Sequence, residues 1–199
     1  MLGLPHGVVK LVPYTPKWKE YYEIEAEKLR SALGEYIVEI RHMGSTAIPG
    51  IRAKPIIDIL MGLENLDNVA HCREPLLDLG YHPYEGGVDI PDWYMFTKIQ
   101  DGRKTHHLHV VEWNSDFWLT RILFQKYLCR HPEVAAAYEE LKVQLAIKYA
   151  DDRDSYTQGK SDFIQAVMEM ALRAERQAKE NGDSSLPIRI PSWPPSVST

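Results

Sequence analysis

Apolar residues recur with helical spacing near the start of the chain and with strand spacing soon after it. Between residues 16 and 33, aromatic and aliphatic residues fall on one helical face and Gly34 follows as a natural stop, so a helix is predicted there. Residues 36–42 alternate as a half-buried strand does, and residues 55–61 form the nearly continuous apolar run of a central strand. A loop containing a Gly-Ser pair is therefore expected between two neighbouring strands.

A helix and a hairpin are predicted in the middle of the chain. Asp67 is expected to cap a helix that reaches Leu79, and Pro75 is expected to kink or shorten it. Residues 93–100 and 104–112 have strand-like patterns. The Asp-Gly pair between these two segments is a strong signal for a tight β-hairpin turn.

From residue 116 onward the pattern is helical. Ser115 is predicted to cap a helix that ends at Arg130, and Pro132 is predicted to begin a second helix that reaches about residue 150. A third helix is indicated by apolar residues at helical spacing, namely Phe163, Ile164, Val167, Met170, Ala171 and Ala174.

These elements predict an α+β fold in which a small mixed sheet packs with helices and the C-terminal half is helical. At 199 residues and 44% hydrophobic content, the chain can form one domain with a substantial core, which we place at residues 1–181. Residues 182–199 are rich in Pro and Ser. They are predicted to form an extended or disordered tail, or in part a docking arm.

The overall charge narrows the class of function. A formal net charge of −5 argues against general nucleic-acid binding, which needs a basic face, but it is compatible with a local basic pocket. Cys72 and Cys129 match no metal or redox spacing and are expected to be reduced and buried. The sequence has no run of about 18 apolar residues and no signal-like start. We therefore expect a soluble cytoplasmic protein without membrane partners.

Residues suited to phosphate binding gather in the loop between the first two predicted strands. Gly44 allows the backbone to come close to a ligand, while Ser45 and Thr46 add hydroxyl and backbone donors that can hold phosphate oxygens. Lys54 can supply positive charge. The alternative is a plain bend in which Gly44 supplies an unusual dihedral angle and Ser45 caps a turn.

Asp58 stands inside the second apolar strand, between Ile57 and Ile59. An unpaired charge in such a position costs several kcal/mol, so the carboxylate is expected to have a cation, a metal ion or a hydrogen-bonded partner. A structural salt bridge is the alternative explanation.

Histidines form a second group of candidate residues. His107 and His109 are two residues apart on a strand and therefore share a face, where they can bind a transition metal together or act beside Asp58 as a base or hydrogen-bond donor. His42 can complete a set of two histidines and one carboxylate with His109 and Asp58. The alternative is that these are strand histidines satisfied by neighbouring groups.

The stretch His-Met-Gly-Ser-Thr-Ala-Ile-Pro-Gly at residues 42–50, followed by Lys-Pro-Ile-Ile-Asp-Ile at 54–59, resembles the GrpB family of the nucleotidyltransferase-like superfamily. The resemblance covers about residues 8–175. Its other landmarks are residues 9–16 with Trp18, and residues 106–110, 127–132 and 156–160. It implies a nucleotidyltransferase-like fold, and the dephospho-coenzyme A kinase domain joined to some relatives implies coenzyme A-related ligands as candidates.

The sequence departs from the superfamily pattern at one position. Active members generally carry two acids separated by one residue, which share magnesium ions about 3.5–4 Å apart. The partner position of Asp58 is Leu60, and this puts two-metal phosphoryl transfer in doubt. Glu112 is the candidate for a third acid on a later strand. Strand alternation, however, places it on the face opposite His107 and His109.

The resemblance also includes Tyr156 and Lys160, which are candidate pocket residues. The Gly-Lys-Ser sequence at residues 159–161 is not a P-loop, because Asp154 stands where the first glycine is required. A lysine at a helix start can still attract an anion. Further candidates for the rim of the pocket are Arg41, Arg52 and Arg103.

The function predicted from these residues is to bind, and as a candidate enzyme to modify, a small phosphate-bearing molecule or a nucleotide. Ser45 and Lys54 would hold phosphate. Asp58 would bind a cation, with Mg²⁺ as the candidate, or orient a hydroxyl, and His109 would be its partner. Such a transferase would lack the second carboxylate of the usual pair. The alternatives are a non-catalytic degenerate transferase that senses a ligand or binds a protein, and, less favoured, a histidine-liganded metal hydrolase.

Overall fold

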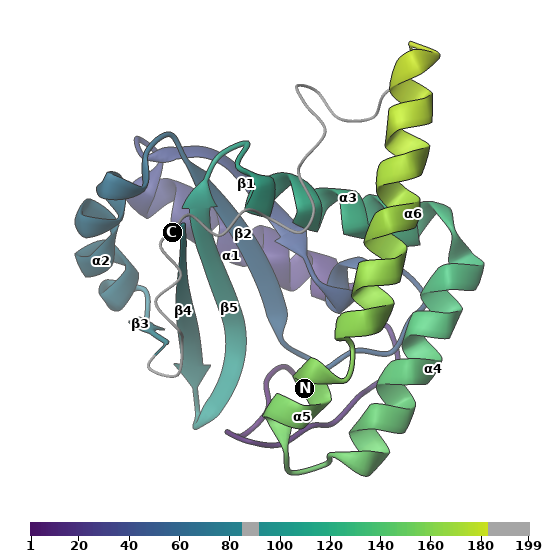
Figure 1. Cartoon of the computed structure of the whole chain (residues 1–199). Coiled ribbons are helices and arrows are strands. Elements are labelled where there is room, and N and C mark those ends of the chain that lie inside the picture. The colour runs from purple at the N-terminus through teal and green to yellow at the C-terminus, as the bar shows by residue number, and fades with distance from the viewer. Residues whose placement is uncertain (85–91, 183–199) are drawn as a thin grey trace.

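The computed structural model describes residues 1–84 and 92–182. Its centre is a mixed five-stranded sheet with the order β1-β2-β5-β4-β3 (Figure 1). The strands are β1 Ile37–Met43, β2 Ile57–Leu63, β3 Tyr81–Pro83, β4 Trp93–Gln100 and β5 Arg103–Glu112. Strands β2 and β5 are parallel neighbours, while β1, β4 and β3 are antiparallel to the strands they pair with.

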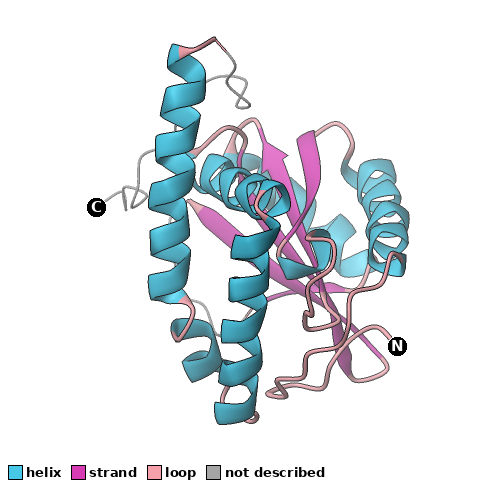
Figure 2. Cartoon of the chain, turned by 90° about the vertical axis from the view of Figure 1, so that its right-hand side faces the viewer, coloured by secondary structure: helices cyan, strands magenta, loops and turns pink. Residues whose placement is uncertain are grey.

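Helices cover both faces of this sheet. They are α1 Lys17–Leu33, α2 Val69–Asp78, α3 Asp116–Arg130, α4 Pro132–Lys148, α5 Arg153–Gln158 and α6 Ser161–Glu180. On one face, Ile57, Ile59 and Met61 of β2 pack in a core cluster with α1 and α2. On the other face, Leu60 packs with residues of α3 and α6. Figure 2 shows α4 and α6 as two long helices side by side, away from α1 and α2.

The α+β fold predicted from the sequence is confirmed, and most element bounds agree within a few residues. The hairpin turn between β4 and β5 has positive φ angles at Asp101 (50°) and Gly102 (71°), as a tight two-residue turn requires. Ser115 caps α3 by accepting a hydrogen bond from the backbone N–H of Trp118 at 3.3 Å. Pro132 begins α4, as expected.

Two expectations about the fold, on Asp67 and on Cys129, need correction. Asp67 does not cap the second helix, because the Asn65 side chain accepts from the Asp67 N–H and starts a 3₁₀ turn, Leu66–Asn68, that leads into α2. Pro75 lies inside α2 and does not end it, since the helix continues for three more residues, and the kink expected there stays a prediction. Cys129 is exposed, whereas Cys72 is buried as expected. Two elements were not predicted, the three-residue strand β3 and the short helix α5. The predicted tail, residues 182–199, lies outside the described residues except for Gly182.

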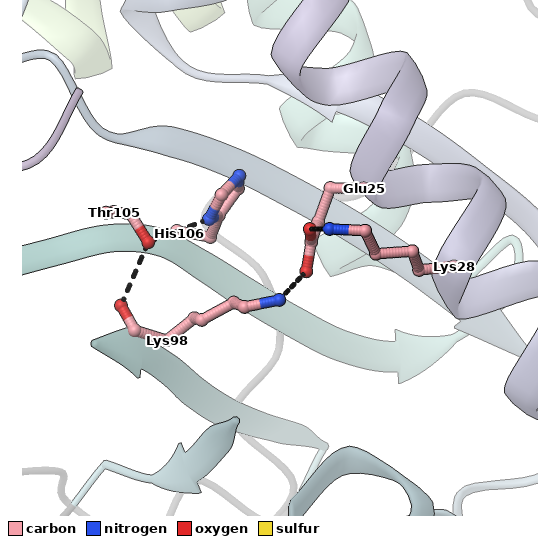
Figure 3. A network of polar contacts seen from close by, with 5 residues as sticks. All are labelled: Glu25, Lys28, Lys98, Thr105 and His106. Atoms are coloured by element: carbon pink, nitrogen blue, oxygen red, sulfur yellow. Dashed lines mark hydrogen bonds and ion pairs between the residues drawn. The ribbon is translucent and has the colours of Figure 1, made fainter. Parts of the chain in front are cut away.

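A buried charged network ties α1 to the sheet (Figure 3). Lys98 Nζ on β4 lies 2.5 Å from Oε1 of Glu25 on α1, and Lys28 Nζ lies 3.1 Å from the other carboxylate oxygen. The Glu25 side chain is 2% exposed. On the neighbouring strand, the Thr105 hydroxyl donates to the Lys98 carbonyl at 3.3 Å and lies 2.9 Å from His106 Nδ1. Both carboxylate oxygens of Glu25 are therefore satisfied, which a buried charge requires.

No helix in the described ranges is long and apolar enough to cross a membrane.

Candidate functional site

A cavity of about 540 Å³ lies on the sheet face that α3 and α6 cover. Its wall takes residues from β1, β2, β4, β5 and the four C-terminal helices. All nine site residues predicted from the sequence line it, namely Gly44, Ser45, Thr46, Lys54, Asp58, His107, His109, Tyr156 and Lys160. The structure thus brings them together, although their roles stay predictions.

Gly44 and Asp58 form one wall of the cavity. Residue Met43 pairs with Asp58 across β1 and β2, so the chain leaves β1 next to the carboxylate. Gly44 has a φ of 72°, in the left-handed region, and a Cβ atom there would overlap Asp58 Oδ2. Glycine is therefore required twice, by the backbone conformation and by the close approach to the acid. The 3₁₀ turn η1, Ser45–Ala47, follows directly.

Asp58 has a histidine partner. Oδ1 of Asp58 lies 2.9 Å from Nδ1 of His107, because parallel pairing of β2 and β5 places these residues opposite each other. The Asp58 side chain is 27% exposed. Burial opposes its ionisation, but the His107 hydrogen bond and the charges of His107, His109 and Lys54 lower the pKa of Asp58 to about 2. The group is thus a carboxylate at neutral pH, and Nδ1–H of His107 donates to it.

His109 is not the hydrogen-bonded partner of Asp58, contrary to the prediction. It lies opposite Leu60 in the register, and its Nδ1 accepts from Nε1–H of Trp93 at 3.0 Å. The Trp93 and His109 rings are stacked with centroids 5.6 Å apart. Burial lowers the pKa of His109 to about 3. His109 is therefore neutral with its proton on Nε2, where it can donate a hydrogen bond to a ligand.

Ser45 and Thr46 differ in their surroundings. Ser45 lines the cavity together with Tyr138 of α4. The Thr46 hydroxyl lies 3.0 Å from Nε2 of His42, whose ring stacks on Tyr22 of α1 at a centroid distance of 4.8 Å. The Ser45 hydroxyl can donate to a ligand oxygen, whereas Thr46 is 3% exposed and mainly fixes the turn.

The proposed set of two histidines and one carboxylate is not assembled. His42 contacts α1 on the face opposite the cavity, so it does not join Asp58 and His109. Within residues 1–84 and 92–182, no group of three or more His, Cys, Asp or Glu side chains is arranged to hold a metal ion. Glu112 is exposed and is absent from the cavity lining of the described residues, as strand alternation predicted.

Cations dominate the polar part of the cavity wall. The lining includes five basic side chains, Lys54, Arg121, Lys142, Arg153 and Lys160, and two acidic ones, Asp58 and Asp154. Nζ atoms of Lys54 and Lys160 lie 5.2 and 4.6 Å from the centroid of the Tyr156 ring, within the range of cation–π contacts. Tyr156 thus positions two lysines beside the same cavity.

Burial and neighbouring cations oppose protonation of these lysines. Burial and, next, the charge of Lys54 lower the pKa of Lys160 to about 8. Burial and the charge of Lys160 lower the pKa of Lys142 to about 7. Lys142 also donates to the backbone carbonyl of Arg52 at 2.5 Å. The lysines of the cavity wall thus repel one another, and each is easier to deprotonate than a lysine in water.

Three of the basic residues were not predicted. The arginines suggested from the sequence, Arg41, Arg52 and Arg103, are not among the described lining residues, and their places are taken by Arg121, Lys142 and Arg153. Arg121 lies 4.5 Å from the Phe117 ring, which stacks on Trp93, so an aromatic stack links it to His109. The sequence does contain an indication that Lys142 faces inward. Helical spacing places it on the same face as Ala135 and Tyr138, and the structure shows that both are buried.

Comparison with known proteins gives consistent results. Residues 8–170 match the family described as GrpB protein. The chain is 42% identical over 171 residues to "Glutamate-rich protein GrpB" of Alkalihalophilus pseudofirmus, covering 84% of this chain and 98% of the relative. The crystal structure of conserved protein GrpB from Enterococcus faecalis is 32% identical with a TM-score of 0.76, covering 83% of this chain and 98% of that one.

A more distant likeness concerns the fold alone. Terminal uridylyl transferase 4 from Trypanosoma brucei, solved with bound dUTP, has 12% identity and a TM-score of 0.53, covering 90% of this chain and 64% of that one. The fold is therefore nucleotidyltransferase-like.

Proposed function

Since this chain belongs to the GrpB family and has a nucleotidyltransferase-like fold, we propose that its cavity binds a small phosphate-bearing molecule or a nucleotide. The observation that carries the proposal is the charge of the cavity. Among the residues that the structure describes, five basic and two acidic side chains line it, in a chain whose formal net charge is −5. Cations held together against the overall charge of a protein favour an anionic ligand.

The size and polarity of the cavity support the same conclusion. A volume of about 540 Å³ falls within the ~300–1,000 Å³ of cavities that hold small molecules. Lys54 and Lys160 would contact phosphate oxygens as charged donors. The Ser45 hydroxyl and Nε2–H of His109 would add neutral hydrogen bonds. Gly44 would let the ligand come close to the backbone at the start of η1.

A second candidate is a module that binds the ligand without transforming it. Leu60 favours it, because this residue is fully buried against Trp118 and Leu119 and adds no oxygen ligand beside Asp58. Transfer chemistry would have to proceed with Asp58, His107 and His109 in place of an acid pair. Both free cysteines, Cys72 and Cys129, suit the reducing cytoplasm in which we propose that the protein acts.

A thermal-shift screen over nucleotides, inorganic phosphates and coenzyme A precursors tests the proposal. A ligand at about 100 times its Kd stabilises a protein by about 2.7 kcal/mol, which for this chain length raises Tm by several degrees. We expect at least one phosphate-bearing compound to do so. Lys54→Gln should reduce the shift, whereas Lys19→Gln on the exposed surface of α1 should leave it unchanged. If no phosphate-bearing compound binds, the proposal is wrong.

Transfer activity is tested separately. The compounds that bind are incubated with labelled nucleoside triphosphates, and the release of pyrophosphate is followed. Release that disappears in Asp58→Asn would favour an enzyme. Binding without release would favour the ligand-sensing module.

A further inference from the structure

We propose that the cavity binds a chain of two or more phosphate groups directly through its own lysine and arginine side chains, without a bridging divalent cation. This inference rests on the proposed function and specifies the ligand chemistry of the same site. The nucleotidyltransferase-like fold implies that Mg²⁺ binds at Asp58. The residues around Asp58 favour a different mode of phosphate binding.

The protein supplies few oxygen ligands for Mg²⁺ at Asp58, because Asp58 is the one acid that β2 and β5 contribute to the described lining. This ion takes oxygen ligands in near-ideal octahedral geometry and is usually held by one or two carboxylates together with substrate phosphates. One carboxylate oxygen of Asp58 already accepts a hydrogen bond from His107. The residue two positions along β2 is the apolar Leu60, and the cavity-facing positions of β5 are His107 and His109. The other acid of the described lining, Asp154, is an exposed residue of α5.

Positive charges already surround the Asp58 carboxylate. The charge of Lys54 helps to lower the pKa of Asp58, and the Asp58 charge in turn counteracts the lowering of the pKa values of Lys54, Lys160 and Arg121. The positive charges of these three side chains oppose the approach of a further cation. In the described residues, none of the three is within ion-pair distance of a carboxylate. Asp58 therefore has its charge balanced by the protein, and the cations keep free capacity for an anion.

The number of basic side chains favours more than one phosphate group. The described lining has five of them against two carboxylates, and Lys142, with a pKa of about 7, is only partly protonated at neutral pH, so the excess is between two and three positive charges. A phosphate monoester carries about 1.5 to 2 negative charges at neutral pH, so a single phosphate would leave part of the excess uncompensated. Burial lowers the pKa values of Lys54 and Lys160, and so do neighbouring cations, chiefly Arg153 for Lys54 and Lys54 for Lys160, as expected for cations that an anion would stabilise.

The position of these side chains favours an extended anion. Lys54 precedes β2, Arg121 belongs to α3, Lys142 to α4, Arg153 to α5, and Lys160 precedes α6. Separate elements contribute them around a cavity of about 540 Å³, which has room for more than one phosphate group. A phosphate chain can contact several at once.

Isothermal titration of the full chain with inorganic triphosphate and with orthophosphate, each in EDTA and in excess magnesium chloride, tests the inference. We expect triphosphate to bind in EDTA at least as tightly as in magnesium, and at least tenfold more tightly than orthophosphate. Binding only in magnesium would overturn the inference and leave the proposed function standing. Equal affinity for the two anions would overturn the preference for a phosphate chain. No binding of either anion, in either buffer, would overturn the inference, and the thermal-shift screen over nucleotides would then decide the proposed function separately.

Asp58→Asn distinguishes the two binding modes by the sign of its effect. If Asp58 holds a metal that bridges to the phosphates, removing its charge weakens triphosphate binding in magnesium at least tenfold. If the side chains bind the anion directly, removing a nearby negative charge tightens binding several-fold in EDTA. Lys54→Gln with Lys160→Gln should abolish binding in both buffers, and Lys19→Gln is the matched control. Melting curves of each variant establish that it is folded, and the wild-type titrations decide the question if a variant is not.

Discussion

A side chain on Gly44 would overlap the carboxylate of Asp58, although the two residues belong to different segments of the fold. The left-handed φ of 72° at Gly44 adds a second constraint. Close approach and backbone conformation therefore act together at the position where β1 ends and the cavity begins.

Gly44→Ala should destabilise the protein by about 2–4 kcal/mol, combining about 1–2 kcal/mol for a left-handed alanine with the cost of moving Asp58. Gly50→Ala is the matched control, since Gly50 has a φ of 86° but no atom lies within 4 Å of the point that its Cβ would occupy. It should cost only the backbone part. Urea denaturation gives both values. An equal decrease in the free energy of unfolding in the two variants would show that the close approach to Asp58 does not contribute to the cost of Gly44→Ala.

Asp58 should contribute to stability in a pH-dependent way. Its pKa falls from 3.8 in the unfolded chain to about 2 in the folded protein, which corresponds to about 2 kcal/mol in favour of folding above about pH 4. Because folding lowers the pKa of Asp58, its contribution to stability is present above the unfolded pKa and is lost as pH falls through the folded pKa. Asp58→Asn should therefore be less stable than wild type by about 1–2 kcal/mol near neutral pH, because asparagine keeps part of the His107 contact.

The difference between the two proteins should shrink to about half near pH 3, where the unfolded acid is largely protonated. Urea denaturation at the two pH values measures it. A difference that does not vary with pH would mean that the Asp58 charge does not stabilise the fold.

The Lys98–Glu25 pair beneath the sheet should be structurally essential. Lys98→Met leaves Glu25 with Lys28 as its remaining ion-pair partner and should cost about 3 kcal/mol or more. Lys28→Met removes a side chain that is 47% exposed and should cost less than about 1 kcal/mol. Chemical denaturation compares them. A similar decrease in the free energy of unfolding in both variants would indicate that the buried ion pair of Lys98 contributes no more to stability than the exposed one of Lys28.

Binding of a polyphosphate should weaken as pH rises. The pKa of Lys160 is about 8 because of burial and the charge of Lys54, so raising pH through this value removes a positive charge from the cavity. Other groups that act on Lys160 are Asp58, Arg153 and Arg121. ATP is a suitable probe, because the last phosphate pKa is about 6 and the charge of ATP therefore stays constant between about pH 7 and pH 9. Its affinity should fall several-fold between about pH 7 and pH 9, and Lys160→Gln should flatten the profile. An unchanged slope in that variant would assign the titration to another group.

Native thiol reactivity should separate the two cysteines. Cys129 is exposed, whereas Cys72 is fully buried and burial raises its pKa to about 11. A thiol reagent should therefore label one cysteine per folded chain, and Cys129→Ser should abolish this reaction. Labelling of both cysteines at equal rates would reveal opening of the α2 face.

The sequence predicted the inner wall of the site well, because short-range rules apply there. Gly44 and Asp58 flank one connection between neighbouring strands, and the two-residue period places His107 and His109 on one face. The choice of His107 as partner of Asp58 depends on the register of β2 with β5, which neither strand specifies alone. A shift of two residues would have brought His109 there instead.

The outer wall could not be predicted in the same way. Arg121, Lys142 and Arg153 reach the cavity because three helices pack at particular angles, and helical periodicity does not give those angles. The buried face of α4 nevertheless carries a lysine among apolar residues, which is a local conflict typical of a functional position. The strand β3 has three residues and α5 has six, too few for either period to emerge.

The Tyr156 ring contacts two lysines that are far apart in sequence, since Lys54 precedes β2 and Lys160 precedes α6. An anion held between them would connect the sheet with the last helix, so a ligand would strengthen the cooperativity of unfolding between the two halves of the chain. Slowed amide hydrogen exchange would then extend from β2 through α6, beyond the residues in direct contact. Without a ligand, the like charges of Lys54 and Lys160 beside Tyr156 favour earlier local opening of α5 and the start of α6.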